Sequence, residues 1–375
     1  MTDSDDLRRR LAAAVPVDDP AWRTARETVP RELFVGDGLF RFDGRHWMPL
    51  HRDRTDPAEW LRLVHRDTTW VTQVDGITAT DATGPVTGRP TSSSTLPSLI
   101  VRMLDLAHLG DGDKVLEIGT GTGYSTAILC ARLGDENVYS IEYDPHLAAA
   151  AAERIHSAGH HPTLLTGDGL AGYQGGAEYD HIVATCAVRH IPPAWLHQVR
   201  DGGTITAAVG GWLPASGLVR LTVHDDGTAT GRRFHADQIS YMLARPHERP
   251  PRPTFRKNPG RTRSTRVRPA LLEDWTGQFL AQLAAPSAEL MTTGEDVILV
   301  DVATGSQAWT EPAGEGWTVH QHGPLQLWDQ VEGALTTWRS AGSPTLSDFG
   351  MTVEENGTQR VWLGSPEGPS WSLPV

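Results

Sequence analysis

The segment from Lys114 to Tyr124, KVLEIGTGTGY, constrains the fold of this chain more than any other stretch. An apolar run typical of a buried strand leads directly into three alternating glycines, Gly119, Gly121 and Gly123. Glycine permits tight turns and lets the backbone approach a ligand closely, and a helix N-terminus next to such a loop offers free N–H groups. We therefore predict a strand, a cofactor-binding loop and a helix over Ser125 to Leu133. The alternative is a glycine turn that binds nothing.

The spacing of the loop argues against a dinucleotide. The dinucleotide motif G-x-G-x-x-G would need glycine at position 124, where the chain has Tyr124. Glu117 ends the strand just before the loop, and a carboxylate there would repel a pyrophosphate but suit a cationic amino-acid group. S-adenosyl-L-methionine carries both an ammonium and a sulfonium, so the pattern favours it over NAD.

Strands and helices alternate along the next hundred residues. We expect strands over 137–143, 162–166, 179–185 and 203–210, and helices over 145–157 and 192–199, which indicates a parallel sheet flanked by helices. Glu142 ends the second strand, where a carboxylate can accept hydrogen bonds from ribose hydroxyls. Asp168, between Gly167 and Gly169, is placed to reach an adenine amino group. All three acids fall at strand ends, where such sheets bind ligands.

Five segments, in order, resemble the motifs of protein-L-isoaspartate O-methyltransferases. They are Val29–Val35, Ser92–Met103, Val115–Leu129, Gly167–Gly169 and Ala208–Gly210. The resemblance covers roughly the first three-fifths of the chain. It implies a class I methyltransferase fold, a Rossmann-like doubly wound α/β sheet, with S-adenosyl-L-methionine as donor and S-adenosyl-L-homocysteine as product. It also implies a peptide aspartyl or isoaspartyl carboxylate as acceptor.

The resemblance assigns roles to particular residues. The expected cofactor-binding residues are Glu117, Gly119, Thr120, Gly121, Gly123, Tyr124, Glu142, Asp168 and Gly169. Thr95 and Ser94 are the catalytic candidates, because a hydroxyl there could orient the acceptor carboxylate. The expected substrate-binding residues are Ser93, Val209, Gly210 and His190. His190 is equally well explained as an ordinary loop residue.

Two departures from the family pattern point to a narrower role. Thr95-Leu96-Pro97 stands where repair enzymes usually have Ser-Gln-Pro or Ser-Ala-Pro, and a long extension follows the methyltransferase core. Together they resemble the branch encoded with ATP-grasp peptide maturases. That branch implies methylation of an Asp side chain in a macrocyclised, ribosomally made precursor peptide (a graspetide), followed by closure to a succinimide (aspartimide). The alternatives are isoaspartyl repair, small-molecule methylation and a non-catalytic peptide-binding relative.

The chain divides into four expected parts. Residues 1–90 form an N-terminal segment with a helical motif, 91–240 the methyltransferase domain, 241–270 a basic proline-rich linker and 271–375 an α+β accessory domain. In the last part we expect helices over 271–284 and 324–340 and strands over 296–302, 317–320 and 360–363. The basic segment from Arg245 to Arg268 is either a solvated linker or a docking strip for an acidic peptide.

The amino-acid composition limits the classes of partner that we expect this chain to bind. The net charge of −13 and a pI near 5.6 disfavour nucleic acid, and the acidic N-terminus with no long apolar run argues against a signal peptide or membrane span. Cys130 and Cys186 are the only cysteines, so we do not expect a disulfide scaffold. We expect a cytoplasmic enzyme. His156 and His160 have no cysteine or carboxylate at ligand spacing, so no metal is expected. The expected partners are an acidic precursor peptide and an ATP-grasp ligase of the same pathway.

Overall fold

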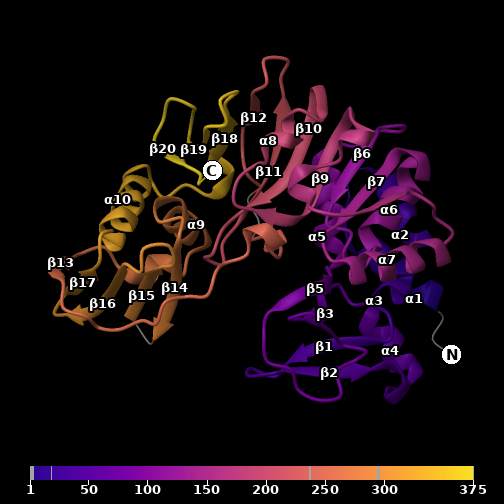
Figure 1. The fold of residues 1–375 in the computed structure, drawn as a ribbon, viewed down its shortest axis with the longest axis horizontal. Helices are drawn as coiled ribbons and strands as arrows, with labels where there is room; N and C mark the ends of the chain where they lie inside the picture. The colour runs from indigo at the N-terminus through magenta and orange to yellow at the C-terminus, as the bar shows by residue number, and fades with distance from the viewer. Residues whose placement is uncertain (1–3, 18, 236–237, 294–295, 375) are drawn as a thin grey trace. The chain divides into compact units, whose positions relative to one another are not determined.

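The computed structural model describes residues 4–17, 19–235, 238–293 and 296–374 (Figure 1). The chain forms two compact units, and each is described by itself. The first comprises Met1–Thr185 and His197–Thr206, and the second comprises Cys186–Leu196 and Ala207–Val375. Strands β9 (Tyr179–Val188) and β10 (Val199–Val209) each run from the first unit into the second. Among the described residues, none of the helices is both long enough and apolar enough to span a bilayer.

The core of the first unit is the expected parallel sheet. Strand β6 (Val115–Ile118) pairs in parallel with β7 (Val138–Glu142) and with β9, and β7 pairs in parallel with β8 (Thr163–Thr166). The order is β8-β7-β6-β9-β10. All four residues of β6 are buried, as expected for a strand covered on both faces. The helices of this region are α5 (Pro97–Ala107), α6 (Tyr124–Leu133) and α7 (Pro145–Ser157), and α6 and α7 both contact β7.

Local sequence signals explain where two of these elements begin. Helix α7 has the predicted bounds, because the Asp144 side chain accepts hydrogen bonds from the backbone N–H groups of His146 and Leu147. The helix predicted over 192–199 is wrong in length, since α8 spans only Pro193–Leu196. The Gln198 carbonyl already accepts a hydrogen bond from the Tyr179 N–H, so the chain has joined the neighbouring strand by that point.

The N-terminal part of the first unit holds a sheet that the sequence did not predict. After α1 (Ser4–Ala14), α2 (Pro20–Thr28) and α3 (Arg31–Val35), the strand order is β2-β1-β3-β4, with β5 paired to β3. These strands are β1 (Gly38–Phe42), β2 (Trp47–His51), β3 (Trp70–Val74), β4 (Ile77–Thr78) and β5 (Pro90–Ser94), and α4 (Pro57–Val64) lies between β2 and β3. Asp43 closes the β1–β2 hairpin by accepting from the N–H groups of Arg45 and His46.

The second unit is α+β, and it includes residues 207–270, which were expected to belong to the methyltransferase domain and a linker. One ladder runs β11-β12-β18-β19-β20 and a separate antiparallel sheet runs β13-β17-β16-β15-β14 (Figure 1). The elements of the first are β11 (Gly217–Val223), β12 (Ala229–Gly231), β18 (Phe349–Val353), β19 (Gln359–Leu363) and β20 (Ser370–Ser372). Those of the second are β13 (Arg261–Thr265), β14 (Ala288–Thr293), β15 (Asp296–Asp301), β16 (Gln307–Ala313) and β17 (Gly316–His322). The helices are α9 (Trp275–Ala284) and α10 (Leu327–Ser340).

Both helices of this unit begin later than expected. Asp274 accepts a hydrogen bond from the Gly277 N–H and so caps α9 at Trp275, while residues Pro269–Leu272 form a separate 3-10 turn. In α10 the side-chain carbonyl of Gln321 accepts from the Trp328 N–H, which satisfies one free donor of the first turn. Trp328 and Trp338 lie in the core, so their role is packing rather than an exposed peptide groove.

Candidate active site

The glycine loop has the conformation that its sequence demands. Gly119, Gly121 and Gly123 have φ angles of 101°, 56° and 93°, a region that residues with a Cβ rarely adopt. The Gly119 N–H donates to the Ile141 carbonyl at 2.9 Å. The Thr185 hydroxyl donates to the Gly119 carbonyl at 2.6 Å, so β9 helps to hold the loop at the carboxyl end of β6.

Glu117 lies inside the core beneath this loop. Its carboxylate accepts hydrogen bonds from the hydroxyls of Ser125, Thr126 (2.5 Å) and Ser140 (2.7 Å), and the residue has no exposed surface. Burial raises the pKa of Glu117, and the three hydroxyls act in the opposite direction. Both carboxylate oxygens are engaged by these hydroxyls, so Glu117 joins β6, β7 and the first turn of α6. Its direct contact with an ammonium group stays a prediction.

Glu142 occupies the end of β7, as predicted. One carboxylate oxygen accepts from the Gly121 N–H at 2.8 Å and the other from the Asp144 N–H at 3.1 Å. A carboxylate oxygen can accept more than one hydrogen bond, so this geometry leaves acceptor capacity beside the loop. Tyr143 follows immediately and is 50% exposed. We did not single out Tyr143 from the sequence, although an aromatic residue directly after the strand-end acid was a usable signal.

Asp168 and Gly169 form a turn at the end of β8. Asp168 is exposed, and its side chain caps the turn by accepting from the Leu170 N–H at 2.9 Å. A Cβ on Gly169 would lie 2.5 Å from the Cγ2 atom of Ile118, so only glycine fits there. This contact places the turn against the end of β6, next to the glycine loop.

Two predicted cofactor residues turn their side chains into the core. The hydroxyl of Thr120 bonds to that of Ser140 at 2.7 Å. The ring of Tyr124 is buried at 5.8 Å from the Phe34 ring, and the Arg31 guanidinium lies 5.9 Å from its centre. Burial also raises the pKa of the Tyr124 phenol. Thr120 and Tyr124 can therefore meet a ligand only through the backbone.

The acceptor candidates lie at the end of β5. A Cβ on Gly121 would lie 4.0 Å from the Ser93 carbonyl oxygen, so β5 adjoins the glycine loop. The Ser94 hydroxyl is buried and has no hydrogen-bond partner among the residues that the structure describes. Thr95 follows it and is partly exposed. The structure thus places the Ser93 carbonyl beside the loop, with Ser94 and Thr95 next along the chain.

A buried arginine, whose role the sequence did not reveal, holds this corner in place. Arg31 has no exposed surface, and its guanidinium donates to the carbonyls of Val64 (2.6 Å), Arg66 (2.5 Å), Thr68 (2.8 Å) and Thr95 (3.3 Å). Burial lowers the pKa of Arg31 to about 10, which leaves the side chain charged at neutral pH. Arg31 belongs to the first family-like motif, and that motif was the available signal.

The remaining substrate-binding candidates belong to the second unit. The Gly210 N–H donates to the Val188 carbonyl at 2.9 Å, so it is already engaged and is not free for a peptide. Val209 and Gly210 line a small cavity of this unit, together with Arg189. The His190 ring packs edge-on against His247, with 4.7 Å between ring centres, and burial lowers the pKa of His190.

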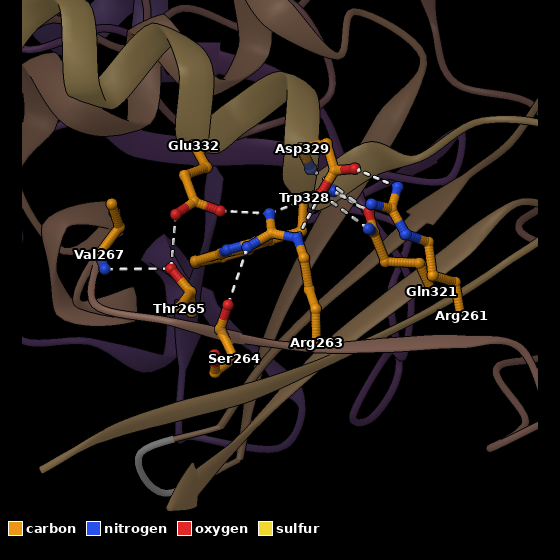
Figure 2. Close-up of polar contacts among 9 residues, drawn as sticks. All are labelled: Arg261, Arg263, Ser264, Thr265, Val267, Gln321, Trp328, Asp329 and Glu332. Carbon is orange, nitrogen blue, oxygen red and sulfur yellow. Dashed lines mark hydrogen bonds and ion pairs between the residues drawn. The ribbon is translucent and has the colours of Figure 1, made fainter.

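The basic segment is neither a free linker nor an open docking strip. Figure 2 shows Arg261 and Arg263, on β13, paired with carboxylates of α10. Asp329 accepts from Arg261 at 2.9 Å and from Arg263 at 2.8 and 2.5 Å, and Arg263 also pairs with Glu332. Closer to the start of the segment, Arg249 and Arg252 pair with Glu289, and Lys257 pairs with Glu311. Most of this positive charge is therefore neutralised within the unit.

His160, which was not expected to bind a metal, lies close to Cys130 and Asp135. Cys130, Asp135 and His160 place potential ligand atoms within 4.8 Å of one another, and His160 Nδ1 lies 2.9 Å from Asp135. Burial raises the pKa of the Cys130 thiol, which opposes the thiolate form that metals bind. Asp135 also accepts from the His161 N–H at 2.6 Å, so its observed role is to join the ends of α6 and α7. Sequence spacing could not show this group, because its members come from three separate elements.

The fold and the loop together define a class I S-adenosyl-L-methionine-dependent methyltransferase. A solved structure titled protein-L-isoaspartate O-methyltransferase aligns over 97% of this chain and 100% of the solved chain, with a TM-score of 0.55. Its sequence is 19% identical, so this similarity supports the fold alone. The family model described as protein-L-isoaspartate(D-aspartate) O-methyltransferase matches residues 57–235.

Curated relatives identify the family. The protein-L-isoaspartate O-methyltransferase of Ignicoccus hospitalis is 37% identical over 158 residues, which are 42% of this chain and 74% of the relative. Protein-L-isoaspartate O-methyltransferase 1 of an Anaeromyxobacter species is 34% identical over 220 residues, which are 58% and 84% of the two chains. The chain belongs to the protein-L-isoaspartate O-methyltransferase family. It is an S-adenosyl-L-methionine-dependent carboxyl O-methyltransferase.

Proposed function

We propose that this enzyme esterifies an Asp side-chain carboxylate in a macrocyclised, ribosomally made precursor peptide of the graspetide type. The observation that carries the proposal is Thr95-Leu96-Pro97, which stands where repair enzymes usually have Ser-Gln-Pro or Ser-Ala-Pro. The methyl group of Thr95 changes the acceptor pocket that a repair enzyme would use. The second unit does not separate the two functions, because a solved structure titled protein-L-isoaspartate O-methyltransferase matches 97% of this chain.

The donor site is built from the first unit. The residues present fit S-adenosyl-L-methionine, because a Cβ on Gly121 would meet nothing closer than 3.9 Å beside Glu142, and Asp168 at the end of β8 is exposed. When bound, this group supplies an electrophilic methyl on a sulfonium. Glu142 would accept from ribose hydroxyls, Asp168 would accept from the adenine amino group, and Tyr143 would offer a ring face. Glu117 would hold the loop and α6 in register from within the core.

The acceptor needs orientation more than it needs a base. A carboxylate with an ordinary pKa near 4 is ionised at neutral pH and arrives as a competent nucleophile. Thr95 would donate a hydrogen bond that fixes the carboxylate in line with the methyl group, together with the Ser94 hydroxyl, which has no partner among the described residues. Arg31 holds the Thr95 carbonyl, so it would act through Thr95 as a positioning residue. Ser93, Val209, Gly210 and His190 would contact the peptide around the acceptor.

The methyl ester then reacts without further catalysis. The backbone nitrogen of the next peptide residue attacks the ester carbonyl carbon and forms a C–N bond. The bond to the methoxy oxygen breaks, and methanol leaves with the amide proton. The five-membered succinimide, or aspartimide, is the product in this proposal. An acidic precursor peptide and an ATP-grasp ligase that closes its macrocycle are the partners it requires.

The test is mass spectrometry of a cyclised acidic precursor incubated with enzyme and S-adenosyl-L-methionine. Gain of one methyl group followed by loss of methanol supports the proposal. Efficient methylation of a generic isoaspartyl peptide, with none of the precursor, would refute it. That result would establish isoaspartyl repair, the second candidate, which the similarity to protein-L-isoaspartate O-methyltransferases favours.

A further inference from the structure

Gln73, on β3, connects the N-terminal sheet of the first unit to the start of α7. The residue is 2% exposed. Its side-chain oxygen accepts a hydrogen bond from the Thr91 hydroxyl at 2.7 Å, and its amide nitrogen donates to the Asp144 carboxylate at 3.4 Å. Both ends of one buried amide are therefore engaged, one by strand β5 and the other by the residue that caps α7.

Two bulges in the β3–β5 pair accompany these contacts. On β3 the extra residue is Thr72, and its hydroxyl donates to that of Ser92 at 3.2 Å. On β5 the extra residue is Thr91, which is the residue that donates to Gln73. A bulge interrupts the regular ladder and re-aims a side chain, and bulges are frequent next to active sites. The irregular pairing thus explains how a residue of β3 comes to bind both β5 and α7.

Asp144 continues the connection to the donor side. One of its carboxylate oxygens caps α7 by accepting from the His146 N–H at 2.9 Å, and the other accepts from Gln73. Its backbone N–H donates to one carboxylate oxygen of Glu142 at 3.1 Å. The second oxygen of Glu142 accepts from the Gly121 N–H at 2.8 Å. A continuous series of contacts therefore runs from β5 through Gln73 and Asp144 to the glycine loop.

Strand β5 also leads to the acceptor candidates. It ends at Ser94, and Thr95 follows directly. A shift of β5 relative to Glu142 would change the alignment of the acceptor carboxylate with the methyl group. Transfer depends steeply on such alignment, since a misplacement of about 1 Å can cost roughly 100-fold in rate. The side chain of Gln73 joins the two sides whose alignment matters.

We propose that Gln73 is a positioning residue that holds the acceptor strand β5 in register with the donor-side acid Glu142. It acts through Thr91 on one side and through Asp144 on the other. The proposal rests on the proposed function in one respect, the assignment of Thr95 to the acceptor site. It holds for either acceptor, the cyclised precursor or an isoaspartyl peptide.

The test compares the steady-state kinetics of the wild type, Q73M, the double variant Q73E/D144N and the control Q174M, which makes the same replacement at an exposed glutamine. The acceptor is whichever of the cyclised precursor and an isoaspartyl peptide the wild type methylates faster. Methionine is close to glutamine in size but has no amide, so Q73M loses both hydrogen bonds. In Q73E/D144N the carboxylate introduced at position 73 accepts from Thr91 and from the amide introduced at position 144. The connection is then restored with donor and acceptor exchanged.

We expect kcat to fall by about 10- to 100-fold in Q73M, because the reactants are bound but misaligned. KM for the acceptor and affinity for S-adenosyl-L-homocysteine should be unchanged, which also shows that the variant is folded. The double variant should recover most of the lost kcat, and Q174M should match the wild type. A purely structural role would lower the free energy of unfolding without this selective loss of kcat.

Two results overturn the assignment of Gln73: a wild-type kcat in Q73M, or a loss of kcat that the double variant does not recover. The outcome for the proposed function is read separately, from which acceptor the wild type prefers. A low kcat in Q73M with the isoaspartyl peptide as the faster acceptor supports the assignment of Gln73 and counts against the proposed function alone.

Discussion

The guanidinium of Arg31 donates a hydrogen bond to the backbone carbonyl of Thr95, which lies 64 residues further along the chain. The same group also donates to three carbonyls, one at the last residue of α4 and two in the loop that leads to β3. One buried side chain thus connects the first family-like motif to the acceptor candidate. The position of Thr95 therefore depends on a residue that does not itself face the donor loop.

Replacing Arg31 should impair both stability and catalysis. We expect R31Q to lower the free energy of unfolding by about 3–5 kcal/mol, because buried carbonyls lose their donors. R31K keeps the charge but reaches fewer carbonyls, so its loss should be smaller. Urea denaturation measures the effect, with the exposed Arg9→Gln as control. A loss of stability in R31Q no larger than that of the control would contradict the assignment of Arg31.

Glu32, next to Arg31, should make the free energy of unfolding depend on pH in acidic solution. Burial alone would raise the pKa of Glu32, but the His65 ring nitrogen 3.3 Å away and a hydrogen bond from Ser4 outweigh it and lower the pKa to about 2 from 4.5. A depressed carboxyl pKa stabilises the folded state above the unfolded value, and this contribution is lost as the pH falls from 4.5 towards 2. The stability difference between the wild type and E32Q should therefore shrink across that window. A difference independent of pH would contradict this prediction.

Gly169 should be intolerant of a side chain. In G169A the new methyl group would meet Ile118 at 2.5 Å, so the turn carrying Asp168 must move away from the donor loop. We expect a cost of about 1–3 kcal/mol in stability and a weaker affinity for S-adenosyl-L-methionine. Gly84 is the control, because a Cβ there meets nothing within 4 Å. Equal donor affinity in G169A and G84A would mean that the turn does not contribute to the donor site.

The ion pairs of β13 should stabilise the second unit rather than bind peptide. R263Q leaves Asp329 and Glu332 without their shared partner, and we expect a loss of about 1–2 kcal/mol in unfolding free energy. R266Q should change stability by less than about 0.5 kcal/mol. Affinity for an acidic peptide should be equal in the two variants. A selective loss of peptide affinity in R263Q would restore the docking-strip interpretation.

Local sequence predicted those features that local forces determine. The glycine loop follows from the φ angles that only glycine adopts readily, and α7 begins where Asp144 and Pro145 place it. The orientation of Glu117 could not be predicted in this way. It depends on three hydroxyls from α6 and β7 that meet only in the folded core.

Long-range pairing accounts for most of what the sequence did not show. Strand β13 was hidden in the basic segment, because its partner β17 comes much later in the chain. Counting charges between Arg245 and Arg268 gave a positive strip, whereas Asp329 is 66 residues from Arg263.

The hydroxyl at position 95 should contribute through a hydrogen bond to the acceptor carboxylate. We expect T95A to lower kcat/KM by about 10- to 150-fold, the equivalent of roughly 1.5–3 kcal/mol. Donor affinity should be unchanged, and the exposed Thr83→Ala should behave as the wild type. T95S retains the hydroxyl, removes the methyl group, and should improve turnover of an isoaspartyl peptide relative to the precursor. Unchanged turnover in T95A would exclude Thr95 from the acceptor site.

The most direct test of the account is a competition between two acceptors for the wild-type enzyme. Equal amounts of a cyclised acidic precursor and an isoaspartyl peptide of matched length are incubated with S-adenosyl-L-methionine and followed by mass spectrometry. We predict that the precursor gains a methyl group and then loses methanol, while most of the isoaspartyl peptide is unchanged. Methylation of the isoaspartyl peptide alone would contradict it.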